Sequence, residues 1–558
     1  MDFLVDFLVS CCSRVFARSL LFLSLLASVV LFTACGSGST STDAGSTDGS
    51  NGSSGTPSGD SGGQLGGSGG GSGPIGGTPT ATIVLNAAGQ TYTAAQDLVA
   101  DGTAFSVAAN DVTIDLNGHT VTYNAASNAS SVYGIYVAQG VSGLTIENGT
   151  ILQGAGNSAS SPAIHFIGSS WARGHSIHDL VIRVTGWKSD GIEADSGYSF
   201  DDSEIYRVYI EDHGDTDAID GAGADPIIVD AMNLGHVRIH DNILVAGHKG
   251  VNVRRICEQC SYPVPLANQS EIYNNKIQHR RRAGSKAPYG IQLAGRTHGV
   301  YVHDNQIASD DGRGIILDGW GQGVSEGCSG NTVSNNRIDV TYSSVATSGA
   351  YVENNVYGIR DRYSSGDNTI TGNTILVASE IAGDVFGMYI GSDATDLLMS
   401  NIVVDNNTVI ARKGAYVGNT PYVYWLDYIN SISISNTKYL TEGSYSNSLS
   451  RVTSITQSSN TALSLTPSSP AAPTGLHLTR FLDSYVLEWN ANAESDVFEY
   501  NVYRDGTKIP MTPRGVLFYV DVGIGGSHDY QISAVTESGT ESALSTAVAT
   551  TSAANGWW

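Results

Sequence analysis

A unit of roughly thirty residues repeats along most of this chain, and such a repeat restricts the chain to architectures built by stacking. Within each unit two apolar residues flank a short polar segment that often contains Asn. The pairs are Leu116/Val121, Ile146/Ile151, Ile177/Ile182, Ile205/Ile210, Ile239/Ile243, Ile272/Ile277, Val302/Ile307, Val333/Ile338, Ile370/Ile375 and Val404/Val409. A unit this short cannot bury its apolar face alone, so successive units must pack on one another.

The composition favours strands over helices for these units. The chain has 66 Gly among its 558 residues, and charged residues make up only 15% of it. Gly and β-branched residues bounded by Asn and Asp are poor material for long helices and typical of short strands and turns. A Gly or Ala followed by an apolar residue recurs in each unit, as in Gly134-Ile135, Gly191-Ile192, Ala218-Ile219, Gly250-Val251, Gly290-Ile291, Gly314-Ile315, Gly358-Ile359 and Gly387-Met388. We therefore predict about ten coils of short strands, stacked at ~4.8 Å per coil.

This pattern resembles the right-handed parallel β-helix proteins of the pectate-lyase-like superfamily. The segment 105–123, FSVAANDVTIDLNGHTVTY, looks like the first coil of many of them. The resemblance covers residues 79–465. It implies an all-β chain whose main domain is a right-handed parallel β-helix of about ten coils.

Asn residues occupy the same place in five successive coils, at Asn275, Asn305, Asn336, Asn373 and Asn407. A strip of polar ligands is one interpretation of this column. We predict instead an Asn ladder, in which side-chain amides hydrogen-bond up and down the stack at a turn with unusual backbone angles.

Residues 470–553 are predicted to form a separate small β-sandwich. They contain short alternating strands, LHLTRF, YVLEWN, EYNVYRDG and HDYQISAVT, with turns between them. Trp489 and the runs that begin at Tyr500 and Tyr530 resemble the fibronectin type III module. The resemblance implies core roles for these residues and a corner role for Tyr530.

Residues 1–35 are predicted to be a lipoprotein-type signal peptide, and residues 36–78 a Gly/Ser-rich linker. The apolar run 20–34 follows basic residues, as in a secretory signal. Small residues stand before Cys35, which resembles the bacterial lipoprotein cleavage box and implies lipidation of Cys35. We expect an exported protein held by a lipid anchor to a membrane at the bacterial cell envelope or surface. A plain signal peptide and an uncleaved anchor are the alternatives.

The charge of the chain points to its class of partner. A formal net charge of −25 argues against nucleic acid, because phosphate contact needs Lys and Arg. Between Ser189 and Asp230 there are 13 acidic residues and one basic residue, whereas nine Lys or Arg lie between Lys249 and Arg296. We expect neighbouring bands in which acidic groups hold a cation or a proton and basic groups hold an anionic ligand.

Alignment of the Gly-apolar elements gathers the charged residues into columns. Asp190, Asp217 and Lys249 fall into one column of the alignment. The second column contains Glu193, Asp220, Asn252 and Gln292. Because the apolar residues between them point inward, the second column should project from one sheet face, about 5 Å between neighbours. Closely spaced carboxylates repel one another unless a positive charge or a shared proton neutralises them. We therefore predict either calcium bound by Asp190, Asp217 and Asp220 or a direct contact between Asp217 and Lys249.

The polygalacturonases place their chemistry at matching positions. Their Asp-Gly turn matches Asp190, the second Asp of their Asp pair matches Asp217, and their Gly-His-Gly motif lies beside His248, here with Lys249 inserted. The resemblance implies acid and base roles for these carboxylates, assisted by His248. Thr216 stands where the first Asp of the pair belongs, which departs from the family pattern.

A group of calcium-dependent pectate lyases offers the second resemblance. Asp190, Asp217 and Asp220 match three of its calcium ligands, and its lysine base would fall at Asn252. Lys249 lies three residues away and would take that role only in a displaced turn. Lyase chemistry needs a cation on the uronate carboxylate and a base for the C5 proton.

A basic loop completes the predicted site. Arg280, Arg281, Arg282 and Lys286 fit a rim that binds uronate carboxylates under either resemblance. We predict that the chain binds or degrades an acidic polysaccharide, as a lyase or a hydrolase, with calcium as the implied cofactor. An inactive sugar-binding descendant and a non-catalytic adhesin or structural envelope protein are the alternatives.

Overall fold

The computed structural model describes the chain from residue 75 onward, with gaps. The described residues are 75–78, 81–126, 131–155, 160–168, 171–186, 189–195, 200–213, 224–230, 235–256, 269–279, 289–310, 313–319, 327–342, 355–364, 366–380, 383–392, 398–414, 418–510 and 515–557. The predicted signal peptide with Cys35 and nearly all of the predicted linker lie outside these residues. In the described part of the chain, no helix is long and apolar enough to cross a membrane.

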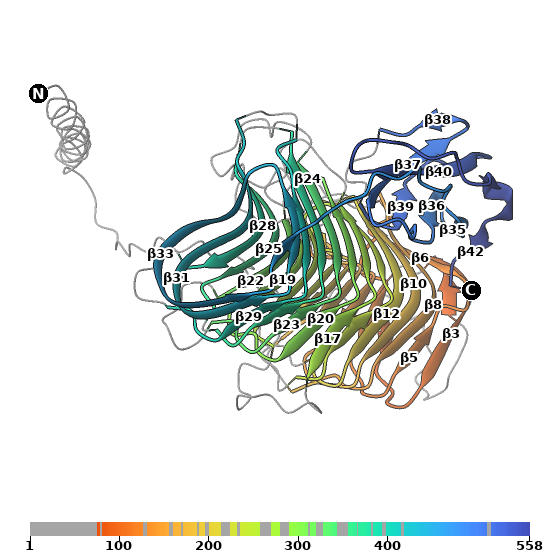
Figure 1. The fold of residues 1–558 in the computed structure, drawn as a ribbon. Coiled ribbons are helices and arrows are strands. Elements are labelled where there is room, and N and C mark those ends of the chain that lie inside the picture. The colour runs from red at the N-terminus through yellow and green to blue at the C-terminus, as the bar shows by residue number, and fades with distance from the viewer. Residues whose placement is uncertain are drawn as a thin grey trace, which may run out of the picture. The chain divides into compact units, whose positions relative to one another are not determined.

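Three ladders of parallel strands make up the main body, in which 34 strands are joined into one continuous sheet. The first sheet contains β2 (Ile83–Leu85), β4 (Phe105–Val107), β7 (Ile135–Val137), β9 (Ile164–Phe166), β11 (Ile192–Ala194), β13 (Ile227–Asp230), β16 (Lys249–Arg254), β19 (Tyr289–Ala294), β22 (Arg313–Asp318), β25 (Val356–Arg362) and β28 (Val385–Gly391). Figure 1 shows these strands stacked in chain order, as in a parallel β-helix.

The second and third sheets follow within each coil. The second sheet contains β5 (Thr113–Asp115), β14 (Arg238–His240), β17 (Ser270–Tyr273), β20 (Val300–His303), β23 (Thr332–Ser334), β26 (Thr369–Thr371) and β29 (Ile402–Asp405). The third contains β1 (Ile75–Gly77), β6 (Thr120–Tyr123), β15 (Ile243–Ala246), β18 (Lys276–His279), β21 (Gln306–Ser309), β24 (Arg337–Tyr342), β27 (Thr374–Ser379), β30 (Thr408–Ala411), β32 (Lys438–Thr441) and β34 (Thr461–Ala462). Longer strands bend through two sheets, namely β3 (Thr91–Val99), β8 (Thr145–Gln153), β10 (Ser176–Val184), β12 (Glu204–Asp212), β31 (Pro421–Ser435) and β33 (Ser444–Ser458). The prediction of an all-β parallel β-helix is confirmed.

The Asn ladder is also present, at the turn between the second and third sheets. Asn275 Nδ2 donates to Asn305 Oδ1 at 2.9 Å, and Asn305 donates in the same way to Asn336 at 2.9 Å. The ladder continues through Asn373 and Asn407. The residue before each ladder Asn has a positive φ, for example 57° at Asn274 before Asn275. Asx residues tolerate this conformation, and the ladder amides satisfy backbone carbonyls that the turn leaves unpaired.

The apolar interior is stacked in register, with one correction to the prediction. Ile182 pairs with Ile210, Ile210 pairs with Leu244, and Leu244 pairs with Ile277. Ile243 therefore does not belong to this interior column, although the repeat placed it there. Its pair with Ile239 spans one residue fewer than the other pairs do, and Leu244 restores the common spacing. Because the side-chain period of a strand is two, a shift of one residue turns Ile243 to the outer face.

The C-terminal residues form two four-stranded sheets. One has the order β39-β36-β35-β42 and the other β38-β37-β40-β41. The strands are β35 (His477–Phe481), β36 (Ser484–Glu488), β37 (Val497–Arg504), β38 (Thr507–Lys508), β39 (Phe518–Asp521), β40 (Asp529–Thr536), β41 (Val548–Ala549) and β42 (Ala554–Asn555), with a short 3-10 helix at Thr550–Ser552. Trp489, Tyr500 and Tyr530 are buried in the shared core, as expected. The Tyr530 hydroxyl donates to the Asp521 carboxylate at 2.6 Å.

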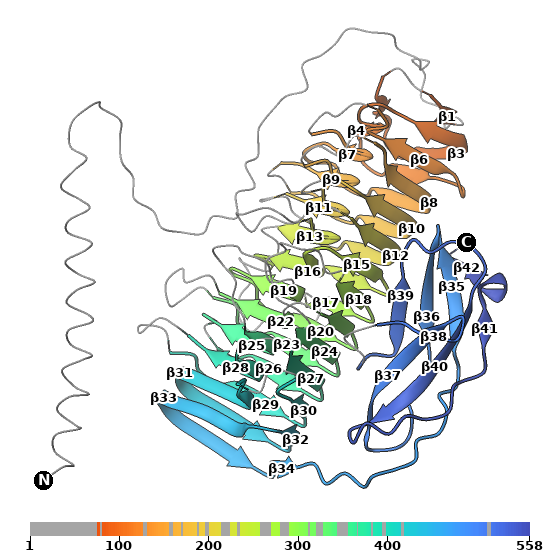
Figure 2. The ribbon, with the colours of Figure 1, turned by 90° about the horizontal axis from the view of Figure 1, so that it is seen from above.

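This C-terminal module packs on the outer face of the third sheet, as Figure 2 shows for β39 beside β15 and β18. Ile243 lies in the apolar contact, and the Tyr209 and Phe481 rings stack with centroids 4.3 Å apart. The Gln278 amide makes two backbone hydrogen bonds to Val520, at 2.8 and 2.9 Å. The module thus occupies one of the three faces of the β-helix.

Substitutions at two neighbouring positions test this register. Leu244→Asp places an unpaired charge between two coils, and we expect it to destabilise the β-helix by about 4 kcal/mol or more. Ile243→Asp should instead loosen the C-terminal module while the β-helix stays folded. Thermal unfolding followed by circular dichroism, with limited proteolysis between the two domains, distinguishes these results. A β-helix that survives Leu244→Asp but unfolds with Ile243→Asp would contradict the register.

Candidate functional site

The outer face of the first sheet carries a continuous column of outward side chains. In chain order it contains Tyr136, His165, Glu193, Ile228, Asn252, Gln292, Ile316, Arg360, Tyr389 and Trp425, which are paired from strand to strand. The column changes from acidic groups at β11 to amides at β16 and β19, and then to arginine and aromatic rings. The middle of the column is buried, since Asn252 and Ile316 have no exposed surface and Gln292 and Arg360 are each 4% exposed.

The structure corrects the predicted alignment of one coil. Ile227, and not Ile219, pairs with Ile192 on one side and with Val251 on the other. The predicted alignment of Ile219 with Ile192 and Val251 was therefore wrong, because the β-branched run of β13 takes the place between β11 and β16. Asp225 stands two residues before Ile227, as Asp190 stands before Ile192, so Asp225 takes the place predicted for Asp217. Asp217 and Asp220 themselves lie outside the described residues.

Asp225 is the centre of a buried hydrogen-bond network. Its Oδ1 contacts His248 Nδ1 at 2.8 Å and accepts from the Lys249 backbone N–H at 3.1 Å. Its Oδ2 accepts from Asn252 Nδ2 at 2.8 Å and lies 4.0 Å from Lys249 Nζ. Burial by itself would raise the pKa of Asp225, but the positive charges of Lys249 and His248 hold that pKa well below its usual value. Asp225 is therefore a stable carboxylate.

Asp190 lies on the adjacent coil and behaves in the opposite way. Its Oδ1 accepts from the backbone N–H of Asp225 at 2.6 Å, and the residue is only 8% exposed. Burial raises the pKa of Asp190 well above its usual value, and the charges of Glu193 and Asp225 add to the rise. The pKa values of two adjacent carboxyl groups are thus shifted in opposite directions, as in sites that separate an acid from a base.

Lys249 and His248 contact the Asp225 carboxylate. Both residues are buried, and Lys249 begins β16. The contact predicted between Asp217 and Lys249 lies outside the described residues, and the carboxylate that faces Lys249 in the structure is Asp225. His279 lies nearby, and burial lowers its pKa to about 4, so its imidazole is neutral. Its Nε2 contacts the Tyr289 carbonyl at 2.8 Å, and its Nδ1 has no hydrogen-bond partner among the described residues.

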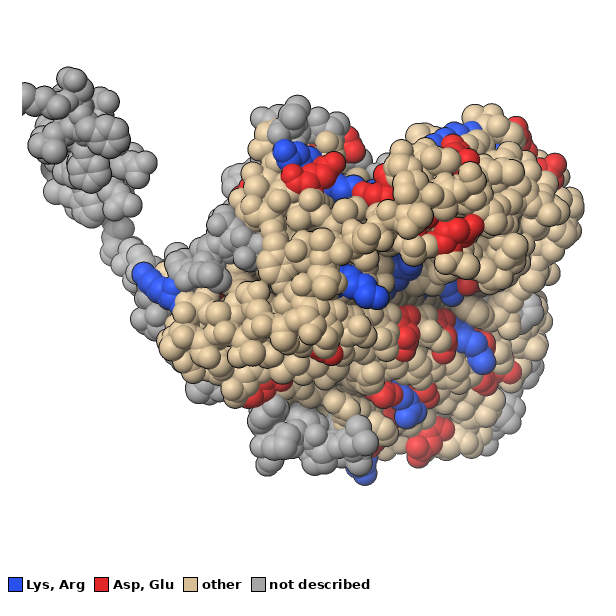
Figure 3. All heavy atoms as spheres, viewed as in Figure 1, with Lys and Arg blue, Asp and Glu red and all other residues tan. Residues whose placement is uncertain are grey.

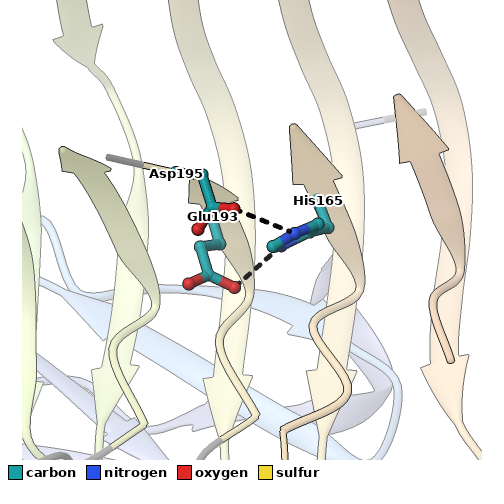
Figure 4. Close-up of side chains that lie close together, drawn as sticks. All are labelled: His165, Glu193 and Asp195. Atoms are coloured by element: carbon teal, nitrogen blue, oxygen red, sulfur yellow. Dashed lines mark hydrogen bonds and ion pairs between the residues drawn. The ribbon is translucent and has the colours of Figure 1, made fainter. Parts of the chain in front are cut away.

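A second cluster lies farther along β9 and β11. His165 in β9 pairs with Glu193 in β11, and its ring lies between two carboxylates in Figure 4. Nδ1 is 2.8 Å from Glu193 Oε2, and Nε2 is 3.7 Å from Asp195 Oδ2. Burial raises the pKa of Asp195 to about 6, against the opposing effect of His165. The sequence reasoning missed His165 because it aligned the coils only from residue 188 onward.

The basic half of the face consists of arginines that alternate with aromatic rings. Arg313 lies over Tyr289 and Tyr357, with its guanidinium 4.9 and 5.4 Å from their ring centroids. Arg360 lies over Tyr357 and Tyr389, at 4.5 and 5.1 Å. Flat, weakly hydrated guanidinium groups stacked on rings suit both carboxylates and sugar faces.

These arginines were not predicted, although the repeat carried a signal for them. Arg360 follows Gly358 by two residues, as Glu193 follows Gly191 and as Asn252 follows Gly250. The basic loop that was predicted, Arg280 to Arg282 with Lys286, lies outside the described residues. The described chain therefore supplies its own basic band through Arg254, Arg313 and Arg360.

The second sheet also carries charged side chains. In Figure 3 acidic and basic side chains are interspersed over the region of β10, β12 and β17. They form pairs such as Arg207 with Asp179, whose Nε and Oδ1 are 2.7 Å apart, and Arg238 with Glu204 at 3.0 Å. Charges on the second sheet are thus neutralised locally, and the strand ends of the first sheet carry ion pairs as well, namely Arg254 with Asp230 and Arg362 with Asp318.

No protein-family model and no curated protein matches the sequence. Among solved structures, the chain is similar to the Dettilon tailspike protein, at 12% identity over 82% of this chain and 72% of that chain, with a TM-score of 0.35. It is similar to an exopolygalacturonase from Thermotoga maritima, at 10% identity over 67% of this chain and 80% of that chain, with a TM-score of 0.29. A Fn3-like protein from Clostridium thermocellum matches 15% of this chain and 92% of its own, at 32% identity and a TM-score of 0.13. These TM-scores are low, so the proposals below rest on the residues of this chain.

The raised pKa of Asp190 predicts a pH dependence of stability. A carboxyl group with a higher pKa in the folded chain stabilises the fold below its unfolded pKa of about 4, and this contribution is lost as the pH rises through the folded pKa. Asp190→Asn keeps an acceptor for the Asp225 N–H but does not ionise. We therefore expect the melting temperature of the variant, relative to wild type, to rise steadily as the pH increases above about 4. A constant difference from acidic to alkaline pH would show that Asp190 titrates normally.

Proposed function

We propose that this chain binds an anionic polysaccharide along the outer face of the first sheet and cleaves it at the centre formed by Asp190, Asp225 and Lys249. The observation that supports this proposal most strongly is the pair of adjacent carboxyl groups with pKa values shifted in opposite directions. Such a pair supplies a proton donor and a proton acceptor at one pH.

The binding half of the proposal rests on the basic and aromatic band. A polymer that lies along the stack would pass Arg313 and Arg360, which are separated by Tyr357. Guanidinium groups bind carboxylates through paired hydrogen bonds, and the rings offer flat apolar surface to sugar faces. Gln292 lies between these arginines and Asn252, and its buried Oε1 has no hydrogen-bond partner among the described residues.

The proposed cleavage assigns a role to each side chain around Asp225. Protonated Asp190 would donate to the leaving glycosidic oxygen. Lys249 would neutralise a uronate carboxylate, and ionised Asp225 or His248 would take up a proton from water or from the sugar. Proton removal from water gives hydrolysis, and proton removal from the sugar gives β-elimination.

A non-catalytic sugar-binding or adhesive role is the second candidate, and one observation favours it. Asp225 is already neutralised by His248 and Lys249 without any ligand. A buried charge network that is satisfied within the protein supports a rigid binding surface as well as a reaction centre.

One assay separates these functions. The purified protein would be incubated with a panel of uronate polymers, with and without calcium, while bound polymer, unsaturated product and reducing ends are measured. Unsaturated product identifies a lyase, and reducing ends alone identify a hydrolase. Binding without turnover supports the non-catalytic candidate, and absence of binding to every polymer would contradict the proposal.

Variants then test the residue roles. Asp225→Asn should abolish turnover and leave polymer binding intact, because it removes the proton acceptor. Since it also removes the charge that faces Lys249 and His248, circular dichroism first checks that the variant is folded. Arg360→Ala should weaken binding by roughly tenfold, about 1.4 kcal/mol. Arg207→Ala on the second sheet serves as the matched control and should change neither property. Equal losses in Arg360→Ala and Arg207→Ala would remove the first sheet from the proposal.

We further propose that the chain is exported and held at the bacterial cell envelope by lipid on Cys35. The apolar run at 20–34 and the small residues before Cys35 support this proposal. Cys35→Ala should release the protein from the membrane fraction, because the acyl acceptor is lost. Mass spectrometry of the mature N-terminal peptide provides the check, and an unmodified peptide with unchanged membrane association would refute the anchor.

A further inference from the structure

We propose that His165, Glu193 and Asp195 form a binding site for a divalent transition-metal ion. One nitrogen or carboxylate oxygen from each residue lies within 4.8 Å of the others. The residues come from two adjacent coils, with His165 paired directly to Glu193 and with Asp195 two positions beyond Glu193. In Figure 4 the three side chains converge on one small space at the sheet surface.

The ligand set selects the class of metal. Imidazole nitrogen suits ions such as Zn²⁺ and Ni²⁺, and carboxylate oxygen suits Mn²⁺, whereas Ca²⁺ takes six to eight oxygen ligands. Metal–ligand distances of about 2.0–2.2 Å place the ligand atoms of a tetrahedral site roughly 3.3–3.6 Å apart, so the carboxylates must shift from their present positions. The carboxylates allow this, because the side chains of Glu193 and Asp195 are 15% and 20% exposed.

The surroundings hold the histidine ring in place. Tyr133 stacks on His165 with ring centroids 4.6 Å apart and an interplanar angle of 10°. The His165 residue itself is buried. A ligand fixed by packing loses little entropy when it binds a metal, which is the condition for a preorganised site.

The charge balance favours a cation at this position. Within the described part of the chain, His165 is the one basic side chain that contacts Glu193 or Asp195. Asp190 lies near enough for its pKa to respond to Glu193. Two carboxylates that share one imidazole therefore have unbalanced negative charge, which a divalent ion would relieve.

This site deepens the proposed function, and in that respect rests on it. A polyanion along the first sheet would be repelled where the face becomes acidic at β11. A divalent ion with three protein ligands keeps open positions for oxygen atoms of the polymer. The ion would therefore convert the acidic end of the face into a second place that holds a sugar carboxylate.

Metal binding is measured first without polysaccharide. Full-length protein treated with a chelator would be titrated with Zn²⁺, Mn²⁺, Co²⁺ or Ca²⁺ by calorimetry and by melting temperature, and the visible spectrum of the Co²⁺ form would report nitrogen ligation. We expect one ion per chain, a rise in melting temperature, and a preference for a transition metal over Ca²⁺. His165→Gln and Asp195→Asn should each weaken binding by roughly tenfold or more. The control His119→Gln alters a partly exposed His–Asp pair and should bind as wild type does.

The outcomes separate this inference from the proposed function. Absence of binding by wild type, or equal affinity in wild type and both ligand variants, would overturn the site. Circular dichroism of the metal-free variants shows that a loss of binding is not a loss of fold. Metal binding without any polymer binding would uphold the site and contradict the proposed function. Polymer binding by a protein that binds no metal would uphold the proposed function and contradict the metal site.

Discussion

Register between strands of adjacent coils is the constraint on which the rest of this structure depends. Each strand of the first sheet pairs residue for residue with the strand one coil earlier, so a side chain that points outward has outward neighbours on both sides. His165 meets Glu193 for this reason, and Arg360 meets Tyr389. The Asn ladder fixes the same register at the turn, because each amide bonds both to the next Asn and to a backbone carbonyl of an earlier coil.

The sequence predicts the fold well because this constraint is periodic. Apolar pairs and a column of Asn identify coils even when the connections vary in length. The prediction of the inward residue failed where two adjacent apolar residues both fitted the repeat, as Ile243 and Leu244 do. It also failed where the connection changed most, at the coil between Ile192 and Val251. There Ala218-Ile219 imitated the repeat, while the run Ile227-Ile228-Val229 formed the strand.

The candidate site was predictable in its location but not in its contacts. Asp190, His248 and Lys249 were assigned to one face from the repeat, and the structure places them around a shared centre. Asp225 was missed because its role depends on the correct register of a single coil. Its low pKa arises from side chains that lie 23 and 24 residues later in the chain, which no local pattern reveals. The Arg and Tyr band depends in the same way on stacking between coils.

The three sheets of the β-helix differ in what covers their outer faces and in how their charged side chains are paired. The C-terminal module covers the outer face of the third sheet through Ile243, Tyr209 and Gln278. On the second sheet, rings of His240, Tyr273 and His303 stack at 4.5 and 5.0 Å, and neighbouring ion pairs cancel its charges. On the first sheet Arg254 pairs with Asp230 and Arg362 with Asp318, whereas Arg313 and Arg360 lie over the ring of Tyr357. Guanidinium groups stacked on aromatic rings suit a ligand that combines anionic groups with flat sugar faces, which is the physical basis for proposing the first sheet as the binding face.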